Sequence, residues 1–226
     1  MKTYIVISEK DWHKSLFASL AKKHKEFKWV FIYKKEDFTF ENLNSLKPEK
    51  IFIPHWSYMI PLEIYNNFEC VVFHMTDLPY GRGGSPLQNL IAKGHEDTKV
   101  TALKVEAGLD SGPVYLKKPL SLHGTAQEIF LRSKHIVEEM IIEIVERKLI
   151  PVAQEGEIFK FKRRKPEQGN LEDLKNIQQI YNYVRMLDCD GYPPAFIETE
   201  EFRLEFTRAS LKSEKEILAD VRIIKK

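Results

Sequence analysis

The chain has 226 residues, of which 35 are Lys or Arg and 33 are Asp or Glu, so its formal net charge at pH 7 is only +2. This length suits one domain with a sizeable core plus a small appendage, and the near-neutral charge argues against a nucleic-acid partner. Cys70 and Cys189 stand in no Cys/His cluster, so the sequence gives no sign of a metal site or a disulfide framework. No apolar run has the length of a signal peptide or a membrane span, so we expect a cytoplasmic protein with no membrane partner.

Apolar strands and amphipathic helices alternate along the first hundred residues. We predict strands at 4–7, 29–33, 51–53, 71–73 and 100–105, and helices at 12–20, 40–46 and 85–94. Such alternation favours parallel pairing, so the expected fold is a doubly wound, Rossmann-like, mostly parallel α/β sheet. The turn after the first strand lacks GxGxxG, which argues against a dinucleotide cofactor there.

The pattern changes in the second half of the chain. We predict a long amphipathic helix at 125–149, a β-like segment at 157–161, a polar linker at 166–170, a helix at 171–187 and a terminal hairpin pairing 202–206 with 221–224. The prediction is therefore a Rossmann-like catalytic domain over residues 1–165 and a small C-terminal α+β extension over 166–226. The apolar helix and hairpin of that extension are a candidate homodimer surface.

His74 and Asp110 are the strongest candidates for chemistry. His74 ends an apolar strand, and Asp110 stands in a loop between Gly108 and Gly112. Ligands of such sheets bind beyond the carboxyl ends of the strands, an edge that His55 also occupies. Because a histidine exchanges protons near neutral pH and an aspartate can orient it, the two residues form an acid/base hypothesis.

Three motifs resemble the 10-formyltetrahydrofolate-dependent formyltransferases, whose pattern runs Asn-x-His, Leu-Pro-x-x-Arg-Gly and Gly-Leu-Asp-x-Gly. The matching segments are 72–74, 78–83 and 108–112, and their order and spacing fit the family. The resemblance implies a formyltransferase that uses N10-formyltetrahydrofolate as formyl donor and no metal. It also implies that His74 stabilises the tetrahedral intermediate or moves its proton, while Asp110 orients the imidazole and accepts charge.

One catalytic residue of the family pattern is missing. The asparagine two residues before the histidine is Val72 here, and valine cannot hydrogen-bond a formyl oxygen. Asn89, on the helix that follows the Arg-Gly loop, is the candidate substitute, with a plain surface position as the alternative. Thr76 and His55 are further candidates for the missing donor.

The segment at 54–61 resembles the folate-binding turn of the family. By this resemblance the folate-binding residues are Ser57, Tyr58, Met59, Ile60, Leu78, Arg82, Gly83, Leu109 and Asp110. Apolar walls with a few backbone groups suit a flat pterin ring. Two alternatives stay open: part of 56–60 belongs to the core, and Arg82 braces its own loop instead of contacting the ligand.

The acceptor of the formyl group is the least determined part. The patterns at 163–166, 184–187 and 192–196 resemble sugar N-formyltransferases, which formylate the amine of a nucleotide-linked amino-dideoxy sugar for polysaccharide biosynthesis. The expected substrate contacts are Ser8, Lys10, Trp12, Thr76 and Arg163. For the basic run 161–165, a solvated charged stretch is the alternative to a phosphate contact.

Two other functions compete with sugar formylation. Methionyl-tRNA formylation is disfavoured by the short C-terminal part, which is small for the β-barrel that helps such enzymes grip tRNA. A catalytically inactive folate- or nucleotide-binding module is motivated by Val72.

Overall fold

The computed structural model describes all 226 residues, Met1–Lys226. They form two compact units that are interleaved along the chain. The first comprises Met1–Arg82, Lys99–Leu120 and Leu131–Lys160, and the second comprises Gly83–Thr98, Ser121–Phe130 and Phe161–Lys226. The predicted boundary at residue 165 stays a prediction, and the second unit also takes in two earlier stretches of chain.

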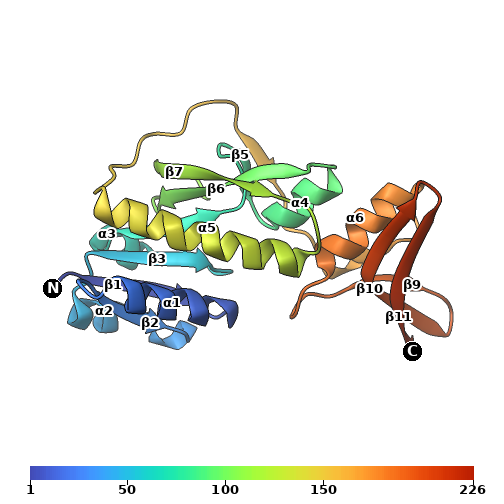
Figure 1. The fold of residues 1–226 in the computed structure, drawn as a ribbon, viewed down its shortest axis with the longest axis horizontal. Helices are drawn as coiled ribbons and strands as arrows, with labels where there is room; N and C mark the ends of the chain where they lie inside the picture. Colours follow the sequence, from blue (N-terminus) through green and yellow to red (C-terminus); the bar gives the residue numbers. More distant parts are fainter. The chain divides into compact units, whose positions relative to one another are not determined.

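A six-stranded sheet with the order β2-β1-β3-β4-β6-β7 organises the first unit (Figure 1). Its strands are β1 (Thr3–Ser8), β2 (Lys28–Ile32), β3 (Lys50–His55), β4 (Cys70–His74), β6 (Asp97–Lys104) and β7 (Val114–Ser121). Strands β1 to β4 pair in parallel, so the prediction of a Rossmann-like, mostly parallel α/β sheet is confirmed. The parallel pairing stops at β6, which runs antiparallel to β4 and places Thr101 opposite His74.

The helices that accompany the strands bury apolar side chains, and the sequence periodicity predicts all of them except the one at 62–67. They are α1 (Trp12–Lys23), α2 (Phe40–Leu46) and α3 (Leu62–Asn67), with α4 (Pro86–Ala92) and α5 (Ala126–Glu146) later in the chain. Ile5, Ile51 and Leu43 belong to one buried cluster of β-strand and helix side chains. None of the helices combines the length and the apolarity that a bilayer crossing needs.

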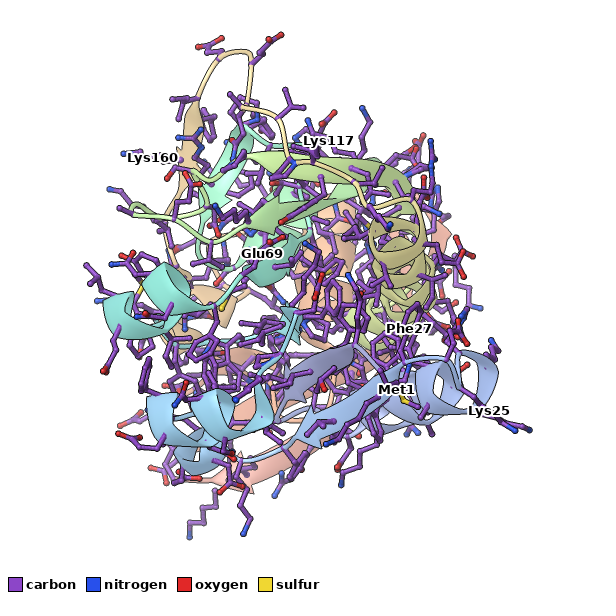
Figure 2. All side chains as sticks on the ribbon, turned by 90° about the vertical axis from the view of Figure 1, so that its left-hand side faces the viewer. Met1, Lys25, Phe27, Glu69, Lys117 and Lys160 are labelled. Carbon is purple, nitrogen blue, oxygen red and sulfur yellow. The ribbon has the colours of Figure 1, made fainter.

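Polar contacts tie three strands of the sheet together near the start of β4. Glu69, labelled in Figure 2, accepts hydrogen bonds from Lys50 of β3 and from the Tyr115 hydroxyl of β7. Burial raises the pKa of Tyr115, so its hydroxyl stays a donor at neutral pH. Strand β7, which the sequence analysis did not predict, is therefore held by side chains as well as by its ladder.

A second polar contact fixes the loop that follows β4. Lys117 of β7, also labelled in Figure 2, donates to the Asp77 carboxylate at 2.5 Å and to the Leu78 carbonyl. Lys99 lies 2.9 Å from the other carboxylate oxygen of Asp77. Burial raises the pKa of Asp77, but the hydrogen bonds from the two lysines outweigh it and hold that pKa below its usual value. Asp77 is therefore an ionised anchor for this loop.

The second unit contains α6 (Ile177–Leu187) and a sheet of order β11-β10-β9, built from β9 (Ala195–Glu198), β10 (Phe202–Ser213) and β11 (Glu216–Lys225). A separate two-stranded sheet pairs β5 (Tyr80–Gly83) with β8 (Phe159–Phe161). The predicted terminal hairpin is present. The predicted helix at 171–187 begins six residues late, because the Asn176 side chain accepts from the Gln179 amide at 2.9 Å and caps α6 there.

The predicted linker at 166–170 is a packed turn. It forms the short 3₁₀ helix Pro166–Gly169, and Gly169 is buried. A Cβ atom at Gly169 would lie 3.1 Å from the Leu187 side chain, so the absence of a side chain allows this turn to approach α6.

Candidate active site

His74 is the last residue of β4 and is 9% exposed. The apolar run before it forms a buried strand, which delivers the imidazole to the carboxyl edge of the sheet. Its Nε2 lies 2.8 Å from the Gly81 carbonyl oxygen. Because a carbonyl oxygen can only accept, Nε2 carries a proton and donates it, and Nδ1 is the nitrogen that remains for proton exchange.

Asp110 faces that second nitrogen. Its Oδ2 lies 3.6 Å from His74 Nδ1, an ion-pair separation that is longer than a hydrogen bond. The loop between β6 and β7 is sharply turned: Gly108 and Asp110 have φ angles of 101° and 50°. A Cβ atom at Gly112 would lie 1.9 Å from the Lys104 carbonyl oxygen, so only glycine fits there. The glycines of the motif therefore shape the turn that presents Asp110.

An imidazole between a backbone carbonyl and a carboxylate is suited to proton transfer. The Gly81 carbonyl fixes the ring orientation through Nε2, and the Asp110 carboxylate lies on the Nδ1 side of the ring. The sequence predicts this pair, and the structure brings its two members together in the first unit.

The guanidinium of Arg82 is held by a neutral side chain, which fits the alternative that Arg82 braces its loop. Its Nε and Nη2 atoms donate to Gln154 Oε1 at 3.1 and 2.8 Å. Gln154 in turn donates from Nε2 to the carbonyl oxygens of Asp110 and Gly112 at 2.9 and 2.8 Å. No sequence motif predicts a role for Gln154, which stands in an aperiodic stretch of the chain.

The predicted folate segment has both exposed and buried members. Tyr58 and Met59 are 43% and 75% exposed, and Leu109 of the Asp110 loop is 57% exposed. Trp56 packs edge-on against Phe38 and Tyr58, so the core alternative holds for this residue. The role of Ser57 and Ile60 in binding stays a prediction.

Two of the predicted folate-binding residues, Leu78 and Gly83, have structural roles in this fold. Leu78 is 1% exposed and belongs to the core. Gly83 has a φ of 114°, and a Cβ atom there would lie 2.3 Å from the Phe161 carbonyl oxygen. Gly83 thus permits the close approach of β5 and β8, and its contact with folate stays a prediction.

The predicted substrate residues Ser8, Lys10 and Trp12 surround a second histidine. Ser8 Oγ lies 2.8 Å from His13 Nδ1 and accepts the Lys10 amide at 3.1 Å, while the Lys10 ammonium lies 5.4 Å from the Trp12 ring centroid. Burial is the main cause that lowers the pKa of His13 to about 3, and burial likewise lowers that of His55 to about 4. Both histidines are therefore neutral at pH 7.

The basic run at 161–165 is partly engaged within the second unit. The Arg164 amide donates to Ser85 Oγ at 3.0 Å, and its guanidinium lies 5.0 Å from the Tyr183 ring centroid. Arg163 is exposed, but its backbone packs closely against Gly84. A Cβ atom added at Gly84 would lie only 2.6 Å from the Arg163 Cβ. Contact between Arg163 and the substrate stays a prediction.

Comparisons with known proteins identify the family. Residues 166–224 match the model of the methionyl-tRNA formyltransferase C-terminal domain. A structure described as methionyl-tRNA formyltransferase from Clostridium thermocellum is 46% identical to this chain, covers 100% of both chains and superposes with a TM-score of 0.97. The chain belongs to the formyltransferase family.

Other relatives of this formyltransferase are more distant. Methionyl-tRNA formyltransferase of Thermodesulfovibrio yellowstonii is 29% identical over 159 residues, which is 67% of this chain and 52% of that protein. The chain thus spans about half the length of the first curated relatives it matches. A sugar N-formyltransferase from a Shewanella species shares the fold at 14% identity and a TM-score of 0.67, over 88% of this chain and 94% of that one.

The position of the family's asparagine is structural in this formyltransferase. Val72 is half-buried and packs against the apolar cluster of the first unit. Asn89, the predicted substitute, donates from Nδ2 to the carbonyl oxygens of Gly84 and Lys162 at 3.0 and 2.9 Å. Both amide hydrogens are engaged, which favours bracing of the β5–α4 turn, and its role as oxyanion donor stays a prediction.

Thr76 is also engaged within the first unit of the formyltransferase. It is fully buried, and its hydroxyl lies 3.4 Å from the Gly81 carbonyl oxygen that His74 also contacts. Its own carbonyl accepts the Thr101 hydroxyl at 2.6 Å. These contacts hold the loop after β4, and a contact between Thr76 and substrate stays a prediction.

Proposed function

We propose that this formyltransferase moves the formyl group of N10-formyltetrahydrofolate to the amine of a methionyl-tRNA. The observation that carries the proposal is the 46% identity, over the full length of both chains, to the protein described as methionyl-tRNA formyltransferase. The match of residues 166–224 to the C-terminal domain of the same enzymes supports it. The comparisons thus favour methionyl-tRNA over the nucleotide-linked sugar expected from the sequence, since the sugar enzyme reported above shares only the fold.

The residues at the sheet edge fit a folate. N10-formyltetrahydrofolate supplies the formyl carbon that is transferred. Tyr58 and Met59 expose apolar side chains on the connection after β3, and Leu109 does so on the connection after β6. Exposed apolar side chains near a few polar groups are typical of sites that bind flat aromatic ligands.

His74 and Asp110 handle the protons of the reaction. A bond forms between the amine nitrogen and the formyl carbon, and the bond from that carbon to N10 breaks. The amine nitrogen loses a proton and N10 gains one, so the site needs a group that accepts and returns a proton. His74 Nδ1 is that group, because Nε2 is held by Gly81, and the Asp110 carboxylate stabilises the charged ring. The imidazolium also stabilises negative charge that develops on the formyl oxygen.

A nucleotide-linked amino sugar is the competing acceptor. The net charge of only +2 suits a small anionic substrate better than a long RNA, whose binding depends on many phosphate contacts. The Lys10 ammonium of the first unit is a cation that such a substrate is predicted to use.

Formyl-transfer assays with purified protein distinguish these functions. The protein is mixed with N10-formyltetrahydrofolate and either methionyl-tRNA or a panel of nucleotide-linked amino sugars, and tetrahydrofolate release and formylated product are measured. We expect formyl-methionyl-tRNA to form, and the His74→Ala variant gives the uncatalysed background. Transfer to a sugar alone would contradict the acceptor, and folate binding without any transfer would indicate an inactive binding module.

A further inference from the structure

Gln154 uses the full hydrogen-bonding capacity of its side chain. Its Oε1 accepts two hydrogen bonds from Arg82, and its Nε2 donates two, to the carbonyl oxygens of Asp110 and Gly112. A primary amide has two acceptor lone pairs and two N–H groups, so none is left over. A surface glutamine that only faced water would not be fixed in this way.

These contacts complete a ring around the candidate catalytic pair. His74 Nε2 contacts the carbonyl of Gly81, which is the neighbour of Arg82 in β5. Arg82 contacts Gln154, Gln154 contacts the backbone of Asp110, and the Asp110 carboxylate faces His74 Nδ1 at 3.6 Å. All five residues belong to the first unit. The two loops that carry the partners of His74 are therefore joined through one side chain.

We propose that Gln154 is a positioning residue that sets the separation of His74 and Asp110. The inference rests on the proposed formyl transfer and adds to it the residue that holds its acid/base pair. Asp110 has a φ of 50°, so the place of its carboxylate depends on the anchors that hold the backbone of its loop. Gln154 supplies one from the side of the Arg82 loop.

Substitutions of Gln154 can separate its contact with Arg82 from its contacts with the Asp110 loop. Gln154→Glu has nearly the same shape and keeps an oxygen for Arg82, now as a charge-assisted pair. Its second oxygen replaces Nε2 and faces the carbonyl oxygens of Asp110 and Gly112, so acceptor opposes acceptor. Gln154→Met keeps the length and removes both contacts without adding repulsion. Ala153→Glu places the same new charge on the adjacent exposed residue and is the matched control.

The kinetic constants distinguish a positioning role of Gln154 from a general destabilisation of the protein. Displacement of a catalytic group by about 1 Å lowers rates by roughly a hundredfold, so we expect kcat of Gln154→Glu and Gln154→Met to fall by about tenfold to a hundredfold. The KM for N10-formyltetrahydrofolate should change by less than about threefold, because the hydrogen bonds of Gln154 do not involve the exposed apolar side chains Tyr58, Met59 and Leu109 that are predicted to contact folate. Ala153→Glu should match the wild type. Wild-type kcat in Gln154→Met, or losses that appear only in KM, would overturn the proposal.

A second readout does not require turnover. In ¹⁵N-labelled protein, the imidazole nitrogen signals of His74, assigned with His74→Ala, report the environment of Nδ1 and Nε2. We expect both Gln154 variants to shift the Nδ1 signal while Ala153→Glu leaves it in place. Unshifted signals in both variants would overturn the positioning role of Gln154 even if the enzyme is active. If the wild type is inactive but the His74 signals still shift in the Gln154 variants, the proposed formyl transfer is contradicted and the positioning role of Gln154 is supported.

Discussion

Two clusters at the carboxyl edge of the same sheet place histidine in opposite electrostatic settings. His13 Nδ1 lies 2.8 Å from the Ser8 hydroxyl oxygen. The positive charges of Lys134 and Lys10 add to burial in lowering its pKa. His74 faces the Asp110 carboxylate at 3.6 Å. Burial without a facing carboxylate lowers the pKa of His13 and keeps its ring neutral, whereas His74 has a carboxylate beside its Nδ1. This difference favours the His74 cluster as the place of the proposed acid/base chemistry.

The largest expected difference between the clusters is in turnover. His74→Ala should lower kcat by at least about a hundredfold, because the proton acceptor is removed. His13→Ala should retain kcat within a few-fold when rates are normalised to folded protein. Steady-state formyl-transfer assays measure both variants. Equal losses of kcat in His74→Ala and His13→Ala would contradict the distinction between the two clusters.

The carboxylate itself is tested by Asp110→Asn. The amide keeps the shape of the side chain but cannot stabilise an imidazolium at His74, so we expect kcat to fall about a hundredfold. Titration with tetrahydrofolate should show a much smaller change than kcat does, because the exposed apolar side chains that are predicted to contact folate are unchanged. A variant with nearly wild-type kcat would remove Asp110 from the chemistry.

The neutral cluster predicts how stability depends on pH. Folding lowers the pKa of His13 from 6.5 to about 3, so between these values the unfolded chain binds a proton that the folded protein does not. The contribution to the unfolding free energy is complete above pH 6.5 and is lost as pH falls toward 3. Denaturant unfolding between pH 6.5 and 5, above the titration of most carboxylates, should show this slope.

His13→Gln provides the comparison for that slope. The glutamine keeps a hydrogen-bonding partner for Ser8 but does not titrate, so we expect a flatter dependence of the unfolding free energy on pH. His55, with a pKa lowered to about 4, contributes in the same direction and accounts for the slope that remains. An unchanged slope would show that His13 titrates normally in the folded protein.

Ser8→Ala is expected to have the smallest effect. It leaves the buried His13 Nδ1 without its partner and should lower the unfolding free energy by about 1–3 kcal/mol. The kcat should stay near wild type, as measured with saturating acceptor. A higher KM for the acceptor would support the predicted substrate contact of Ser8, and a large loss of kcat would extend the catalytic site to this cluster.

Local patterns predicted most of the elements that carry the site. The apolar run at 71–73 identified β4 and hence the position of His74, and the glycines around Asp110 identified its turn. The strands β5, β7 and β9 and the helix α3 were missed. Strand β7 contains two lysines and a proline, and it gains its place from Tyr115 and Lys117 contacts with residues distant in the sequence.

The antiparallel direction of β6 also could not be predicted from the local sequence pattern. Alternating strands and helices predicted continued parallel pairing, which holds for β1 to β4. Strand β6 instead pairs antiparallel with β4. Strand direction depends on where the connection re-enters the sheet, and periodicity within the strand does not encode that path.

The sequence by itself determined the family motifs, the strand that ends in His74 and the turn that contains Asp110, because these depend on residues close together in the chain. Only the tertiary structure decided that Nε2 of His74 is held by Gly81 and that Nδ1 faces Asp110. It also decided that Gln154 joins the two loops. A single amide in an aperiodic stretch has no sequence signature, since its partners are brought to it only when the sheet and its connections pack together.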